Sequence, residues 1–132
     1  MVIQYKDTKR VAAADVARVF QNSGIRRPFH DLPRIQRMID HSGPLITARA
    51  GQQMVGIARA VSDFSYCCYL SELAVDRSYQ KQGVGKTLLE RLKRKLSDEV
   101  SLILISVPEA EAFFLKAGFI RSDRSYIIPR SR

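Results

Sequence analysis

The stretch that decides the fold is residues 69–96, which reads YLSELAVDRSYQKQGVGKTLLERLKRKL. Its first eight residues alternate apolar and polar side chains, a pattern that is typical of a β-strand. Its last part carries leucines at helical spacing, from Leu88 to Leu96, and a short loop with Gly83 and Gly85 lies between the two. A strand that leads through such a loop into a helix predicts a phosphate-binding site. The first N–H groups of a helix have no intrahelical partner, and the helix dipole is positive there.

Two common phosphate-binding motifs do not match this loop. A P-loop whose last glycine is Gly85 needs a glycine at position 80, which is Gln80. The dinucleotide-binding fingerprint matches at Gly83 and Gly85 but needs a third glycine at position 88, which is Leu88. The pattern Gln80-x-x-Gly83-x-Gly85 instead resembles the acyl-coenzyme A loop of the GNAT superfamily of N-acetyltransferases.

A second module supports the same resemblance. An apolar run that starts at Leu102 predicts a buried strand, and a helix is expected to follow it. GNAT proteins typically carry the motif F-Y-x-x-x-G-F in that helix. This chain has Phe113-Phe114 and then Gly118-Phe119. The resemblance therefore covers about the C-terminal half of the chain and is looser upstream.

The predicted elements follow the order β-α-α-β-β-β-α-β-α-β, which matches the GNAT topology. We expect a single domain, 1–132, of mixed α+β class, with a central sheet of about six to seven strands and helices on both faces. The predicted elements outside the two modules are a strand at 2–5, a helix at 9–22, a helix capped by Asp31, a hairpin of 45–50 and 54–61, and a last strand at 120–128.

Composition narrows the class of protein. Hydrophobic residues make up 45% of the chain, enough for a real core. No apolar run reaches the roughly 18 residues of a membrane helix, and the N-terminus lacks a long apolar stretch, so we expect a cytoplasmic protein that does not enter a membrane. The two cysteines, Cys67 and Cys68, are adjacent on a predicted strand. Their side chains should point to opposite faces, so neither a disulfide nor a zinc site is expected.

The net charge of +9 leaves a nucleic-acid role open. Against that role, the basic residues are spread along the chain and no DNA- or RNA-binding motif is present. We therefore interpret the charge mainly as solvated surface, with a contribution toward a cofactor that carries several phosphates.

The resemblance implies how acetyl-coenzyme A, the expected co-substrate, would bind. Its pantetheine arm would meet the backbone of the central strand, and its pyrophosphate would lie on the amides of the loop. A backbone N–H near Leu73 would stabilise the oxyanion of the reaction. The cofactor-binding residues that the resemblance implies are Leu73, Ala74, Val75, Gln80, Lys81, Gln82, Gly83, Val84, Gly85, Lys86, Phe113 and Phe114.

The attacking amine must lose a proton, and Glu72 is our candidate for the catalytic base or for the group that orders a basic water. Many family members carry an acidic residue at this point of the central strand. The structural alternative is a strand carboxylate that faces solvent or pairs with an arginine. At the motif position where relatives place a proton-donating tyrosine, this chain has Phe114, which has no proton to give.

The acceptor is not encoded in the motifs. We expect a primary amine, either a small molecule or a protein amine. Arg26, Arg27 and His30 lie on the segment that often lines the acceptor cleft in this family. They would select an anionic acceptor or form solvated surface.

Three functions stay open at this stage: an acyl-coenzyme A-dependent N-acetyltransferase, which we favour; an acyl-coenzyme A-binding regulator or sensor without turnover; and a basic nucleic-acid-binding domain on a GNAT-like scaffold. Many relatives form dimers, so a homodimer also stays open.

Overall fold

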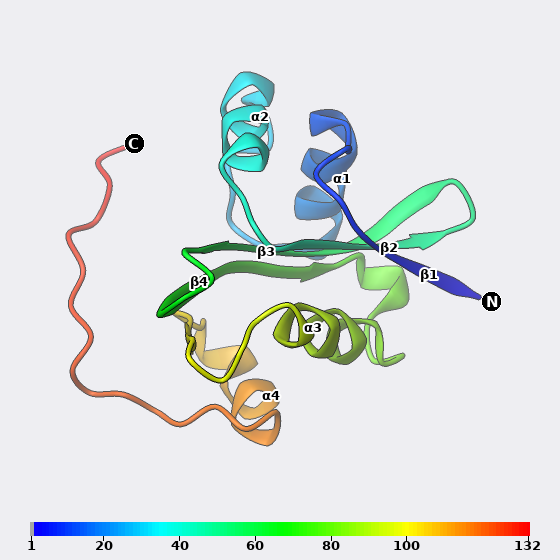
Figure 1. Cartoon of the computed structure of the whole chain (residues 1–132). Helices are drawn as coiled ribbons and strands as arrows, with labels where there is room; N and C mark the ends of the chain where they lie inside the picture. The colour runs from blue at the N-terminus through cyan, green and yellow to red at the C-terminus, as the bar shows by residue number, and fades with distance from the viewer. Residues whose placement is uncertain (1) are drawn as a thin grey trace.

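The computed structural model describes residues 2–132 (Figure 1). Its elements, in chain order, are β1 Ile3–Asp7, α1 Ala13–Ser23, α2 Leu32–Asp40, β2 Leu45–Ala50, β3 Gln53–Ser62, β4 Cys67–Val75, α3 Val84–Arg94, β5 Ser101–Ile103 and α4 Glu111–Lys116, with 3₁₀ turns at Arg77–Tyr79 and Pro108–Ala110.

The five strands lie in the order β1-β2-β3-β4-β5. All neighbours are antiparallel except β4 and β5, which are parallel. Helices α1 and α2 cover one face of the sheet, and α3 and α4 lie on the other (Figure 1). The expected mixed α+β GNAT fold is confirmed.

Each face of the sheet buries its own apolar cluster. On the α1–α2 side, Val16, Val19 and Phe20 of α1 meet Ile35 and Ile39 of α2 and apolar side chains of the sheet. On the opposite side the leucines of α3 pack on the sheet, and those buried are Leu88, Leu89 and Leu92. Burial of each such side chain contributes about 1.5–3 kcal/mol, so α3 and the loop before it are held firmly on the sheet.

The register between β3 and β4 shifts by one residue at Ser71. Arg59 lies opposite Glu72, but the next residue of β3, Ala60, lies opposite Leu70. Ser71 is therefore the extra residue of a β-bulge. On a regular strand, two residues that are four positions apart have their side chains on the same face. Here Leu70 belongs to the α3-side cluster and Ala74 to the α1–α2-side cluster. The bulge thus reverses the alternation and turns Glu72 toward α1 and α2.

Strands β4 and β5 run side by side for only a short distance. The paired residues are Cys67 with Ser101, Cys68 with Leu102 and Tyr69 with Ile103. Strand β4 continues to Val75, whereas β5 ends at Ile103. Residues 70–75 of β4 therefore have no strand partner on the β5 side, and a gap opens between this half of β4 and the segment after β5.

The strand predicted at 120–128 is not formed, and this lowers the strand count from the expected six or seven to five within residues 2–132. Residues 121–125 are all polar, so the segment offers no apolar face with which to cover the sheet. Ile120, Tyr126 and Ile128 are each at least 90% exposed. This C-terminal segment instead runs past the end of the sheet toward the α1–α2 side, where Arg34 Nη2 of α2 donates a hydrogen bond to the main-chain oxygen of Arg132 (3.1 Å).

The first helix also differs from its prediction. It begins at Ala13, four residues after the expected start, with Ala12 as a cap that makes no side-chain hydrogen bond. The Thr8 hydroxyl accepts a hydrogen bond from the backbone N–H of Arg10, before the helix begins. The predicted cap of the second helix is confirmed, since the Asp31 carboxylate accepts a hydrogen bond from the N–H of Arg34.

Candidate active site

The loop between β4 and α3 is bent by two residues with a left-handed backbone, Lys81 (φ 63°) and Gly83 (φ 83°). Gly83 is the residue before the first turn of α3, and no side chain caps the helix there. The loop is tied to β4 because Gln80 Nε2 donates to the carbonyl of Val75 (2.8 Å). The first N–H groups of α3 are thus left without an intrahelical partner at the positive end of the helix dipole, which is the arrangement that binds a phosphate group.

Gly83 and Gly85 differ in what they do for this loop. The positive φ of Gly83 is a conformation that other residues adopt only with strain. A Cβ added at Gly85 would lie 3.7 Å from Val75 Cγ2 and 3.8 Å from Phe113 Cζ, which are ordinary contacts. Gly83 therefore fixes the loop shape, whereas Gly85 mainly keeps the first turn of the helix bare.

A cleft of about 400 Å³, which we call the β4–β5 cleft, occupies the gap where the two strands separate. Predicted site residues line it from both sides: Leu73, Ala74, Val75 and Gln80 on the β4 side, and Phe114 from α4. The segment after β5, 104–107, forms the facing wall. The structure therefore brings together the two halves of the predicted site that are about 40 positions apart in the sequence.

Lys86 and Phe113, two other predicted site residues, line a separate cavity of about 460 Å³ between α3 and α4. Lys93 and Lys116 also line it. The loop and the start of α3 line neither the β4–β5 cleft nor this cavity. The predicted site residues on this stretch are Lys81, Gln82, Gly83, Val84 and Gly85.

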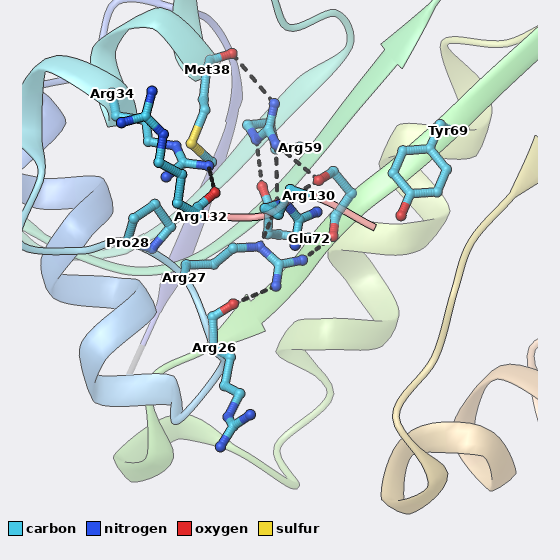
Figure 2. A pocket seen from close by; sticks show the side chains of 11 residues that line it. Arg26, Arg27, Pro28, Arg34, Met38, Arg59, Tyr69, Glu72, Arg130 and Arg132 are labelled. Carbon is cyan, nitrogen blue, oxygen red and sulfur yellow. Dashed lines mark hydrogen bonds and ion pairs between the residues drawn. The ribbon is translucent and has the colours of Figure 1, made fainter. Parts of the chain in front are cut away.

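Beyond the bulge lies a third cavity of about 400 Å³, which we call the arginine cleft (Figure 2). It shares Arg26, Arg27 and Ser71 with the β4–β5 cleft, so the two are adjoining. Tyr69 and Glu72 of β4 line it from the sheet. The arginines that line it are Arg26, Arg27, Arg34, Arg59, Arg130 and Arg132.

Glu72 is buried in this cleft and is held by two arginines. Its carboxylate Oε2 accepts from Arg27 Nε (2.7 Å), from Arg59 Nη2 (3.0 Å) and from the Ser71 hydroxyl. Its Oε1 accepts from Arg59 Nε. Burial alone would raise the pKa of Glu72, but the hydrogen bonds and charge of Arg59, with the bonds from Ser71 and Arg27, outweigh burial and lower the pKa.

The role of Glu72 as the base stays a prediction. Its contacts limit how it can act, because a lowered pKa makes the carboxylate a weaker proton acceptor. A carboxylate has about four acceptor positions in all. The three bonds on Oε2 fill that oxygen, so the free position is on Oε1, where a water would fit the chemistry.

Several residues of the arginine cleft were missed in the sequence, and two of them carried a signal. Arg59 is a charged residue inside the apolar run 54–61, and it is only 7% exposed. Ser71 and Glu72 are two polar residues in a row within an apolar strand, which marks the bulge. Arg34, Arg130 and Arg132 carried no such signal, because only the fold brings the C-terminal segment to α2.

The two histidines do not line either cleft. The His30 ring stacks at a tilt against Phe29, with ring centres 4.3 Å apart. Nδ1 of His41 lies 2.8 Å from the carbonyl of Arg37, which can only accept a hydrogen bond, so Nδ1 carries the proton.

Phe114 lines the β4–β5 cleft and packs edge-on against Phe113 and Phe119 (ring centres 5.2 and 5.5 Å apart). Within residues 2–132 no tyrosine lines this cleft. The Ser106 hydroxyl does line it, and it donates to the carbonyl of Val107 (2.7 Å). Tyr126, a second tyrosine that could supply a proton in principle, is 93% exposed and does not line this cleft. Among residues 2–132, no other tyrosine at this cleft therefore replaces the proton-donating tyrosine that relatives carry.

The chain is similar to known proteins in both sequence and fold. Residues 16–127 match the acetyltransferase (GNAT) domain family. The chain is 25% identical over 126 residues to the uncharacterized N-acetyltransferase ycf52 of Porphyra purpurea, covering 90% of this chain and 71% of that protein. Three plant acetyltransferases are 34% identical over only 70 residues, and the match spans 27–30% of their length.

Solved structures share the fold. A GNAT-family acetyltransferase from Streptococcus pneumoniae superposes with a TM-score of 0.80 at 24% identity, with 99% of each chain covered. The PaiA N-acetyltransferase from Thermoplasma acidophilum in complex with coenzyme A superposes with a TM-score of 0.74 at 16% identity, covering 95% of this chain and 94% of that one. The family match spans most of the sequence, and the chain therefore belongs to the GNAT superfamily of N-acetyltransferases.

Proposed function

We propose that this protein transfers an acetyl group from acetyl-coenzyme A to a primary amine by direct attack. The observation that carries the proposal is the β4–β5 cleft, which begins at the splayed strands and lies beside the bare first turn of α3. A thiol-release assay with acetyl-coenzyme A over several classes of amine tests it.

The residues present suit the co-substrate at both of its ends. The loop from Gln80 to Lys86 offers backbone N–H groups to the pyrophosphate, and the backbone of Leu73, Ala74 and Val75 would meet the pantetheine arm. Lys86, Lys93 and Lys116 around the α3–α4 cavity are suited to the remaining phosphate charge. Phe113 and Phe114 supply apolar contact on the α4 side.

In the proposed reaction the neutral amine nitrogen attacks the thioester carbonyl carbon, and a new C–N bond forms. The C–S bond then breaks, the coenzyme leaves as a thiolate, and the amine proton passes to water. An N–H of β4 near Leu73 would stabilise the negative charge on the carbonyl oxygen.

The attacking amine must be in its neutral form, so the proposed reaction should speed up as the pH rises toward the pKa of the amine. We propose that Glu72 takes part through a water on Oε1 rather than by direct contact with the amine, since its other acceptor positions are occupied.

The leaving thiolate does not depend on a tyrosine in this proposal. A thiol has a pKa of about 8.5, so the thiolate is a tolerable leaving group near neutral pH. Phe114 at the tyrosine position would pack on the pantetheine arm instead.

The same Phe114 favours one alternative, a protein that binds acyl-coenzyme A as a sensor or regulator without turnover. The two functions separate in one assay, because a sensor would be stabilised by acetyl-coenzyme A and would release no thiol with any amine. A nucleic-acid-binding role would instead show steeply salt-dependent binding that coenzyme A does not affect.

The setting of the reaction is also part of the proposal. Within the part of the chain that the structure describes, no helix is long and apolar enough to cross a membrane. Cys67 and Cys68 are both free thiols, as suits a reducing cytoplasm. The homodimer stays a prediction.

A further inference from the structure

The charge of the arginine cleft is far from balanced. Six arginines line it, and its lining includes one carboxylate, Glu72. The arginines come from the segment after α1, from α2, from β3 and from the C-terminal segment. Figure 2 shows Arg27 and Arg59 directed at Glu72, whereas the side chain of Arg26 points away from them. A charged surface that only faces solvent gives no reason for arginines from four parts of the chain to line one cleft, so this cleft suggests a binding site.

Two of the six arginines are already committed to the protein. Arg59 donates to Glu72, to the Ser42 hydroxyl (3.1 Å), to the Ser71 hydroxyl (2.9 Å) and to the carbonyl of Met38 (3.3 Å). Arg27 donates to Glu72, to the Ser71 carbonyl (2.7 Å) and to the Arg26 carbonyl (2.5 Å). Glu72 and the bulge thus hold these two guanidinium groups at fixed places in the wall.

The other four form no ion pair with an acidic side chain of residues 2–132. The guanidinium of Arg34 donates one hydrogen bond, to the main-chain oxygen of Arg132. The guanidinium groups of Arg26, Arg130 and Arg132 make no hydrogen bond with a described residue. These donors are therefore available to a ligand.

Cations gathered in a cleft repel one another, and the low-dielectric walls reduce the screening by solvent. A bound anion removes this repulsion. Guanidinium groups bind the paired oxygens of carboxylate and phosphate in a bidentate manner. The cleft thus has the charge and the donors for one of these two groups.

The anion would lie close to the reaction. Ser71 lines both clefts, and Leu73 lines the β4–β5 cleft two residues further along the strand. Two strand residues span about 7 Å, the length of a short carbon chain. A volume of about 400 Å³ holds a small molecule rather than a folded partner.

We propose that the acceptor is a small primary amine that also carries a carboxylate or phosphate group, and that the arginine cleft binds this anionic group while the amine faces the β4–β5 cleft. The inference rests on the proposed acetyl transfer. Arg130 and Arg132 take part as specificity residues on the C-terminal segment.

A binding experiment tests the anion site without turnover. Inorganic phosphate at millimolar concentration, against chloride of equal ionic strength, should raise the melting temperature of the wild type. The double variant R130A/R132A should lose this shift, and it should fold because both residues are exposed. The matched control R10A/R124A removes two exposed arginines outside the cleft and should keep the shift. No shift in the wild type, or the same shift in R130A/R132A, would overturn the inference.

A turnover experiment tests the acceptor class. Phosphoethanolamine is compared with ethanolamine, and glutamate with glutamine, at equal concentrations of the neutral amine. We expect at least one anionic member to be favoured in kcat/KM by about ten- to a hundredfold, as expected for hydrogen bonds to a charged group. R130A/R132A should remove that preference by raising KM for the anionic amines, whereas the control R10A/R124A should keep the preference.

The outcomes distinguish a failure of the acceptor inference from a failure of the proposed acetyl transfer. Turnover of neutral amines at the same rate as their anionic partners leaves the acetyltransferase in place and overturns the anionic acceptor. Turnover of an acidic peptide with no small anionic amine acetylated overturns the small-molecule assignment. Failure of every amine contradicts the proposed function itself, and the acceptor inference then falls with it.

Discussion

Arg59 and Glu72 face each other across β3 and β4, and Arg59 donates hydrogen bonds to both oxygens of the Glu72 carboxylate. Both side chains are buried, at 7% and 2% exposure. The pair stands at the bulge of Ser71, where the central strand changes the direction of its side chains. One ion pair thus links the strand geometry of the GNAT fold to the wall of the arginine cleft.

The pair should make stability depend on Glu72 and on pH. Glu72→Gln removes one partner of a buried ion pair and leaves Arg59 without its counter-charge, so the free energy of unfolding should fall by about 3 kcal/mol at neutral pH. The pKa of Glu72 is lowered in the folded state, so its contribution is present above the ordinary value of 4.5 and is lost as the pH falls through the folded pKa. The difference between wild type and variant should therefore shrink only below about pH 4.5.

Urea unfolding of both proteins between pH 3 and pH 8 measures this difference. Glu99→Gln, on an exposed residue outside the clefts, is the control and should change stability by less than about 0.5 kcal/mol at any pH. A Glu72→Gln protein as stable as wild type at pH 7 would show that the ion pair contributes nothing net.

Glu72→Gln should also slow turnover while leaving acetyl-coenzyme A binding unchanged. If Glu72 works through a water, kcat should fall by about 10²-fold, the lower end of the usual range, because its pKa is lowered and it is a weak acceptor. Steady-state kinetics at a temperature where the variant is folded, with a thermal-shift titration of acetyl-coenzyme A, separates the two effects. Full kcat in the variant would remove Glu72 from the chemistry.

A negative charge at the start of α3 should abolish co-substrate binding. Saturating acetyl-coenzyme A should raise the melting temperature of the wild type by several degrees through mass action. Gly85→Glu places a carboxylate where the phosphate is expected, beside Val75 and Phe113, and should remove that rise. Gln52→Glu adds the same charge at the exposed β2–β3 turn and should keep it. Equal shifts in both variants would place the co-substrate elsewhere.

Phe114 should give the enzyme an unusual pH profile. With no tyrosine lining the cleft within residues 2–132, the rate should rise as the amine loses its proton and should not fall steeply toward pH 10. Phe114→Tyr should keep or raise the rate at neutral pH. Turnover of both proteins from pH 6 to pH 10 measures this. A bell-shaped wild-type profile with an acidic group near pH 9–10 would reveal another acid, and Ser106→Ala would be the first variant to make, since Ser106 lines the cleft.

The sequence predicted the parts of this site that depend on local patterns. The Gln80 loop, Gly83 at the helix start and the leucines of α3 follow from turn and helix rules that act over a few residues. The loop motif and Phe114 lie far apart in the chain, but their placement followed from the family topology. The strand predicted at 120–128 is wrong because the polar run 121–125 offers no apolar face to the sheet.

The arginine cleft could not be predicted from local sequence patterns. Arg27 and Glu72 form an ion pair, but the two residues are 45 positions apart and nothing in the sequence joins them. Their contact depends on the bulge at Ser71, which turns Glu72 toward α1 and α2. Arg130 reaches the cleft only because the C-terminal segment leaves the sheet.

The central claim is acetyl transfer to an amine at the junction of the two clefts. The most direct measurement is thiol release from acetyl-coenzyme A with a panel of anionic and neutral primary amines between pH 6 and pH 10. The acetylated product is identified by mass. We predict thiol release that depends on the amine, in equal amount to an N-acetylated product. A protein that acetyl-coenzyme A stabilises, but that releases no thiol with any amine across this pH range, would contradict the account and identify the fold here as a coenzyme-binding module.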